Sequence, residues 1–197
     1  MARPQEFDTD TVLDRAMHLF WIKGYDEASI QDLVEATGLN RGSLYNAFGD
    51  KAQLFAAVME RYRASSPARI LASAPDDASS RQLITDFMQS LVDRAHKDKH
   101  NKGCLLTNTA AGLYGCNDAM TAWVRDTLVM LEDILTNVVE RGQDRGEISQ
   151  HSDARALARF FVATAQGINV MARANPDDQA LQDIVDNALL TLGSLTD

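Results

Sequence analysis

The chain has 197 residues, of which 45% are hydrophobic and 24% are charged, so it can fill the core of one large domain or two small ones. No apolar run reaches the roughly 20 residues of a membrane-spanning helix, and the first ten residues lack the apolar core of a signal peptide. We therefore expect a cytoplasmic protein with no membrane partner. The net charge of −9 offers no overall basic footprint for nucleic acid, and two cysteines are too few for a disulfide framework.

The first predicted helix runs from about Asp8 to Lys23 and ends at Gly24. Its apolar residues recur every three or four positions, which is the spacing of a helix with one buried face. They are Val12, Leu13, Ala16, Met17 and Phe20.

Residues 29–51 predict two short helices joined by a tight turn. Ser29 begins a capping-box pattern, and Gly38 ends the first helix because a residue without a Cβ atom adopts the left-handed conformation at little cost. Asn40 then caps a second helix, residues 41–48, whose first turn is polar enough to read DNA bases. The pattern predicts a helix-turn-helix. We expect its buried seam to consist of Phe20, Leu39, Leu44 and Phe48.

A fourth helix with a strong apolar face is predicted from Lys51 to about Arg63. Residues 65–80 are rich in Ser, Ala, Pro and Asp and predict a loose connection, so we divide the chain into domains 1–63 and 64–197. Five more helices make the fold all-α with about nine helices, a three-helix helix-turn-helix domain followed by a helical domain. Their ranges are 81–97, 104–113, 118–145, 153–174 and 177–195.

Four motifs in the first 60 residues resemble a known family. They are Gly24-Tyr25, residues 36–39 (ATGL), residues 42–48 (GSLYNAF) and Lys51, and their order and spacing are similar to those of the TetR family of bacterial transcriptional regulators. Val34 departs from the pattern, since the family usually has a small alanine there. The resemblance implies a homodimer that binds a palindromic double-stranded DNA operator, usually as a repressor. A small-molecule effector in the C-terminal domain would release it.

Candidate DNA contacts lie on the second helix of the helix-turn-helix and beside it. Arg41 has paired donors that match guanine O6 and N7, or it contacts a phosphate instead. Lys51 begins a helix whose dipole attracts phosphate, and its alternative is a solvated surface lysine. The resemblance implies a phosphate contact for the Tyr45 hydroxyl. The whole set comprises Thr37, Asn40, Arg41, Gly42, Ser43, Tyr45, Asn46 and Lys51.

The first forty residues are acidic, which is unusual beside a DNA-binding surface. Binding depends on the local field at the contact surface rather than on the total charge. We expect Arg3, Arg41 and Lys51 to form a small positive strip while the carboxylates face away. Specificity should then rest on base contacts.

The C-terminal domain predicts an effector pocket that is mostly apolar with a few polar groups. One face of a short helix and the walls of neighbouring helices supply the candidates, and ordinary core packing is the alternative for each of them. They are Cys104, Asn108, Ala111, Trp123, Met130, Phe161 and Gln166.

Cys104 opens that short helix, where the helix dipole would stabilise a thiolate. One hypothesis is therefore a sensor of electrophiles or oxidants, and the other is a small buried residue. Whether its thiol meets that of Cys116 is open. His96, His100 and Cys104 have the spacing of a metal-binding helix face, but the polar residues between them predict a break, so we predict no metal and no cofactor.

The last two predicted helices carry more apolar surface than the chain's own fold requires. We expect a four-helix bundle between two subunits, and packing within one chain is the alternative. The candidate interface residues are Ala163, Gly167, Ile184, Ala188, Leu189 and Leu192.

Two other classes of function compete with a DNA-binding regulator. An enzyme would need a nucleophile with its base, a glycine loop for phosphate or paired carboxylates in a cleft, and the sequence has none of these patterns. A helical adaptor that binds protein instead of DNA is favoured by the acidic N-terminal domain. We predict the regulator, and we expect no enzymatic activity.

Overall fold

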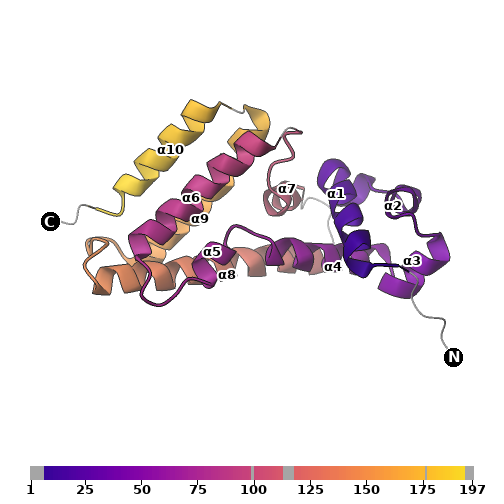
Figure 1. Cartoon of the computed structure of the whole chain (residues 1–197), viewed down its shortest axis with the longest axis horizontal. Helices are drawn as coiled ribbons and strands as arrows, with labels where there is room; N and C mark the ends of the chain where they lie inside the picture. The colour runs from indigo at the N-terminus through magenta and orange to yellow at the C-terminus, as the bar shows by residue number, and fades with distance from the viewer. Residues whose placement is uncertain (1–6, 99, 113–117, 176, 194–197) are drawn as a thin grey trace. The chain divides into compact units, whose positions relative to one another are not determined.

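The computed structural model describes residues 7–98, 100–112, 118–175 and 177–193. These residues form ten α-helices and no strand, which confirms the predicted all-α class (Figure 1). The helix that the sequence did not predict is α5 (Arg69–Ala72), a single turn inside the predicted connection. The chain divides into two compact units, Met1–Ser66 and Pro67–Asp197. None of the described helices is long and apolar enough to span a membrane.

The first unit consists of α1 (Thr9–Glu27), α2 (Ile30–Thr37), α3 (Arg41–Phe48) and α4 (Lys51–Ala64). Gly24 breaks α1 at a kink with a φ of 77°, where the sequence predicts the end of the helix, and a few more helical residues follow up to Glu27. Each helix begins with a side-chain cap, which satisfies backbone N–H groups that have no partner within the helix. The capping residues are Asp8, Ser29, Asn40 and Asp50.

The core of the first unit lies between α1 and α4, with α2 and α3 packed on it. The rings of Phe20 and Phe55 meet edge to face with centroids 4.9 Å apart. Leu39 and Phe48, predicted as core, are only half-buried, because each lies next to the turn at one end of α3. The fully buried positions include Val12, Ala16, Leu33, Leu44, Leu54, Val58 and Met59.

The second unit contains α5 and the longer helices α6 (Ser80–Lys97), α8 (Asp118–Asp144), α9 (Ala154–Ala174) and α10 (Asp178–Leu190), with the short α7 (Leu105–Ala111). In Figure 1, α6, α9 and α10 lie side by side, and all three contact one another. Helix α8 packs along α9 and also contacts α6. The core is filled by large apolar side chains, among them Ile84, Met88, Leu135, Phe161, Ile168 and Leu181.

One arginine at the start of α6 links three segments of the second unit by hydrogen bonds. The Arg81 guanidinium in α6 donates to the carbonyl oxygen of Glu147 at 3.0 Å and to that of Leu192 at 3.2 Å. The second of these carbonyls lies just beyond α10, where the last carbonyls of a helix lack partners within it. This arginine therefore ties α6 both to the turn after α8 and to the end of α10.

Candidate nucleic-acid interface

The turn between α2 and α3 is fixed by local hydrogen bonds. The Ser29 hydroxyl accepts from the backbone N–H of Asp32 at 3.1 Å, and the Asp32 carboxylate accepts from the Ser29 N–H at 2.9 Å. Gly38 has a φ of 76° and ends α2 in the left-handed conformation. The Asn40 side-chain oxygen accepts from the Ser43 N–H at 2.9 Å and starts α3. These bonds confirm the predicted bounds of both helices.

The first turn of α3 is the most accessible part of the predicted interface. Asn40, Arg41 and Gly42 are exposed, as is Asn46 one turn later. Ser43 and Tyr45 are half-buried. The guanidinium carbon of Arg41 lies 5.5 Å from the centre of the Tyr45 ring, a cation–π contact that directs the arginine along the outer face of α3.

Thr37 does not join this surface, contrary to the prediction. Its side chain is 3% exposed, and its hydroxyl donates to the Leu33 carbonyl at 2.6 Å while accepting from the Leu39 N–H at 3.3 Å. The hydroxyl is thus buried and bonded at the end of α2. We omit Thr37 from the interface.

Lys51 is held in place rather than freely solvated. Its ammonium lies 4.4 Å from the centre of the Tyr25 ring and donates to the Asp26 carbonyl at 3.4 Å. Sequence reasoning missed this role of Tyr25, although the Gly24-Tyr25 pair formed part of the motif. Lys51 also lines a small depression with Tyr45 at the junction of α3 and α4. The lysine charge therefore sits beside α3.

Ion pairs neutralise acidic groups elsewhere in the first unit. Lys23 pairs with Asp32 at 2.7 Å. Arg61 binds the Asp14 carboxylate through two nitrogens, at 2.5 and 2.8 Å, and reaches Asp10 at 2.7 Å. The Arg61 hydrogen bond holds the pKa of Asp14 below its ordinary value. These pairs neutralise three carboxylates, the positive strip of Arg41 and Lys51 stays a prediction, and Arg3 lies outside the described residues.

Lys23 is the main cause of the lowered pKa of the Asp32 carboxyl. Its hydrogen bond, followed by those from Ser29, lowers the pKa of Asp32 from 3.8 to about 2. Since the folded pKa is depressed, the stabilisation is present above pH 3.8 and is lost as the pH falls through about 2. We expect Lys23→Met to raise the pKa of Asp32, measured by NMR titration of its carboxyl carbon. An unchanged pKa would show that the serine cap alone sets it, and Lys23→Arg should preserve the low value.

Comparisons with known proteins agree with this geometry. The model of bacterial regulatory proteins of the tetR family matches residues 12–58, and that of the tetracyclin repressor-like C-terminal domain matches residues 81–188. The HTH-type transcriptional repressor ComR of Escherichia coli is 31% identical over 191 residues, which cover 95% of this chain and 90% of ComR. The chain belongs to the TetR family of bacterial transcriptional regulators.

Two further relatives of this TetR-family regulator match over almost their whole length. The HTH-type transcriptional regulator YezE of Bacillus subtilis is 30% identical over 193 residues, covering 98% of this chain and all of YezE. A cysteine mutant of the TetR-family regulator CifR, complexed with 26-bp double-strand operator DNA, is 30% identical with a TM-score of 0.82, covering 95% of this chain and 98% of CifR. The family consists of regulators of transcription rather than enzymes.

The predicted effector residues of the regulator are only partly brought together. Gln166 of α9 accepts a hydrogen bond from Thr107 of α7 at 2.7 Å, so the α7 and α9 walls meet through a polar pair that sequence reasoning missed. Asn108 donates to the Lys102 carbonyl at 2.7 Å. Ala111 is exposed at the last residue of α7, so it does not line the interior. Phe161 is fully buried and Cys104 is 7% exposed, while Trp123 and Met130 are half-buried.

The predicted dimer residues divide into two groups. Ala188 and Leu192 are 1% and 0% exposed, because they face the core of their own chain, so for these two the interface prediction is wrong. Ala163 and Gly167 are exposed on α9, and Ile184 and Leu189 are half-buried on α10. Sequence reasoning missed the large exposed apolar residues around them, which are Phe160, Val170, Met171 and Leu190.

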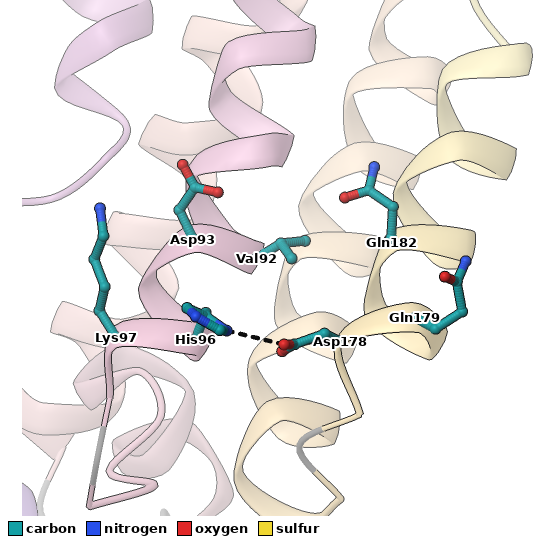
Figure 2. Close-up of a pocket in the computed structure, with 7 residues that line it drawn as sticks. All are labelled: Val92, Asp93, His96, Lys97, Asp178, Gln179 and Gln182. Atoms are coloured by element: carbon teal, nitrogen blue, oxygen red, sulfur yellow. Dashed lines mark hydrogen bonds and ion pairs between the residues drawn. The ribbon is translucent and has the colours of Figure 1, made fainter.

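The spacing of His96, His100 and Cys104, considered as a metal-binding helix face, is interrupted by the break that the sequence predicts between them. Helix α6 ends at Lys97, so His100 and Cys104 do not continue the face that carries His96. Instead, His96 Nδ1 lies 2.9 Å from the Asp178 carboxylate across an open groove of about 330 Å³ between α6 and α10 (Figure 2). Among the described residues, no group of three or more His, Cys, Asp or Glu side chains is placed to hold a metal ion.

Proposed function

We propose that this TetR-family regulator is a homodimeric repressor that binds a palindromic operator through α3 and is released by a small-molecule effector. The observation that carries the proposal is the capped, exposed first turn of α3, where Arg41 extends over Tyr45. A polar first turn on the second helix of a helix-turn-helix is what contacts base edges in the major groove. The operator complex of CifR, a relative of 30% identity, supports the same use of this unit.

We infer a dimer because one recognition helix is too short to read a whole operator. A single short α3 spans only a few base pairs, whereas two copies related by a two-fold axis read two half-sites about 34 Å apart. The exposed apolar stripe of α9 is the surface that we assign to the second copy, with Leu190 of α10 beside it. Burying such a stripe removes apolar area from water, the usual source of stability in obligate dimers.

The effector would act on the spacing of the two recognition helices. We place its site where α7 meets α9, because Thr107 and Gln166 provide hydrogen-bonding groups in an otherwise apolar region. A ligand that binds one arrangement of the dimer more tightly shifts the population toward it. Release then requires only that this arrangement no longer fits successive major grooves.

A salt titration tests the DNA-binding part of the proposal. The full-length protein is mixed with labelled DNA from upstream of its own coding region and, in parallel, with a shuffled duplex of equal length. A repressor should bind one sequence with high affinity and lose affinity as salt rises. Equal, weak binding to both duplexes would instead support the adaptor alternative, which the acidic N-terminal unit favours.

Cys104 offers a second route of release, as a reactive thiol. It occupies the N-cap position of α7 and is 7% exposed, so little of the residue is accessible to a reagent in this conformation. If the thiol is the switch, Cys104→Ser should bind the operator as wild type does and should no longer be released by electrophiles, in the same gel-shift assay. Release of the mutant by electrophiles would overturn this alternative. Cys116 lies outside the described residues.

A further inference from the structure

The lysine and arginine side chains that the structure describes in the first unit fall into two groups according to their partners. Lys23, Arg61 and Arg63 form ion pairs with carboxylates of α2, α1 and α4, respectively. The second group contacts neutral atoms instead. Its members are Arg15, on a backbone carbonyl, Arg41, on an aromatic ring, and Lys51, on a ring and a carbonyl.

The second group surrounds the recognition helix. Arg41 is the first residue of α3, and Lys51 is the first residue of α4, directly after it. Arg15 belongs to α1, but its Nη1 donates to the Thr37 carbonyl at 3.2 Å, at the last residue of α2. It also passes Gly38, where a Cβ atom would lie 3.6 Å from Nη1. The guanidinium is therefore placed at the turn that leads into α3.

Among the described residues, no carboxylate lies within ion-pair distance of Arg15, Arg41 or Lys51. In a unit with an excess of acidic residues, three cations without a carboxylate partner around a single helix create a local positive field that favours an external anion. One hydrogen bond to a carbonyl uses one of the five donors of a guanidinium.

We propose that Arg15 is a DNA contact that binds a backbone phosphate of the operator, beside the half-site read by α3. The Thr37 carbonyl fixes one side of the guanidinium and reduces the entropy lost when the remaining donors bind phosphate. The contact carries no sequence information and serves to position α3 on the duplex. The inference rests on the proposed function, since it requires that the unit binds DNA.

Two substitutions at Arg15 test its charge. Arg15→Gln removes the charge and is too short to reach the Thr37 carbonyl as Nη1 does, and Arg15→Lys keeps the charge. Operator affinity is measured for each from about 0.05 to 0.3 M salt. The slope of log K against log salt is negative, and each lost phosphate contact reduces its magnitude by about 0.9. Arg15→Gln, which removes one contact from each protomer, should therefore reduce the magnitude by about 1.8. Arg15→Lys should keep the wild-type slope.

The matched control is Arg63→Gln, which removes an ion-paired arginine at the other end of α4 and should leave the slope unchanged. A loss of affinity in Arg15→Gln without a change of slope would overturn the inference, because Arg15 would then only support the turn. Wild-type affinity in Arg15→Gln would overturn it as well. If the wild-type protein itself has no preferred sequence, the proposed function fails instead, which the same titration reveals.

Discussion

Replacing Arg41 by methionine is expected to remove most of the sequence preference of the protein. A bidentate arginine contact to guanine contributes about 1–3 kcal/mol of discrimination, a factor of about 5–150 at each half-site. Arg41→Met should therefore weaken binding to the operator far more than binding to unrelated DNA. Fluorescence anisotropy with the operator, and with variants changed at one base pair, measures both effects.

The structure gives the physical reason for choosing this residue. Arg41 is exposed in the first turn of α3, and its guanidinium rests over the Tyr45 ring, which limits the directions that the long side chain samples. Arg41→Lys keeps the charge but lacks the planar fork of donors, so it should restore non-specific affinity without restoring specificity. Tyr45→Phe keeps the ring beneath Arg41 and should preserve base preference even where it loses a phosphate contact.

A different result would reassign Arg41 to the DNA backbone. Arg41→Met could weaken binding equally on all sequences and reduce the magnitude of the salt slope by about 0.9 per protomer. The arginine would then contact phosphate, and other residues of α3 would contact the bases. The exposed Asn40 and Asn46 would then be the next residues to substitute.

The parts of the fold that follow from short-range rules were predicted to within a residue or two. Ser29 and Asn40 cap helices, and Gly38 forms a left-handed turn; each acts only on the next few residues. The bounds of α2 and α3 can therefore be predicted from the sequence. The long helices of the second unit follow from the spacing of their apolar residues. Two departures remain: α5 was not predicted, because one turn is too short to show a period, and α10 ends at Leu190 rather than at the predicted residue 195.

The errors arise where the outcome depends on distant packing. Thr37 is polar and lies at a helix end, which does not reveal that its side chain is buried and bonded to the Leu33 carbonyl. The position of Arg15 depends on a contact across 22 residues, so its role was absent from the sequence prediction. An apolar stripe likewise shows that a face is buried but not against what, and Ala188 and Leu192 turned out to face their own core.

Gly167 is a position that the chain's own fold does not explain. It lies in the interior of α9, where glycine costs about 0.5–1 kcal/mol relative to alanine. A Cβ atom added there would meet nothing within 4 Å, so nothing in the chain requires its absence. The apolar Phe160 and Val170 flank it on the same exposed face. The missing side chain is accounted for if a second copy approaches α9 closely at this point.

Gly167→Leu is expected to prevent dimerisation and, with it, operator binding. In a two-fold interface the same patch meets itself, so each substitution enters the contact twice. Forcing a large side chain into a packed contact costs about 1–3 kcal/mol for each copy, enough to lower the dimer association constant by about 30-fold or more. Sedimentation velocity over a concentration series measures the dimer, and gel shift measures the loss of operator binding.

The alanine variant separates the two roles of this position. Gly167→Ala should raise the thermal stability of the isolated protomer, because alanine favours the helix, while it still weakens the dimer. Asn137→Leu, at an exposed position of α8, is the control for the added leucine and should leave the dimer intact. A Gly167→Leu protein that remains dimeric would place the subunit contact away from α9. The two recognition helices would then be brought to successive major grooves by another surface of the second unit.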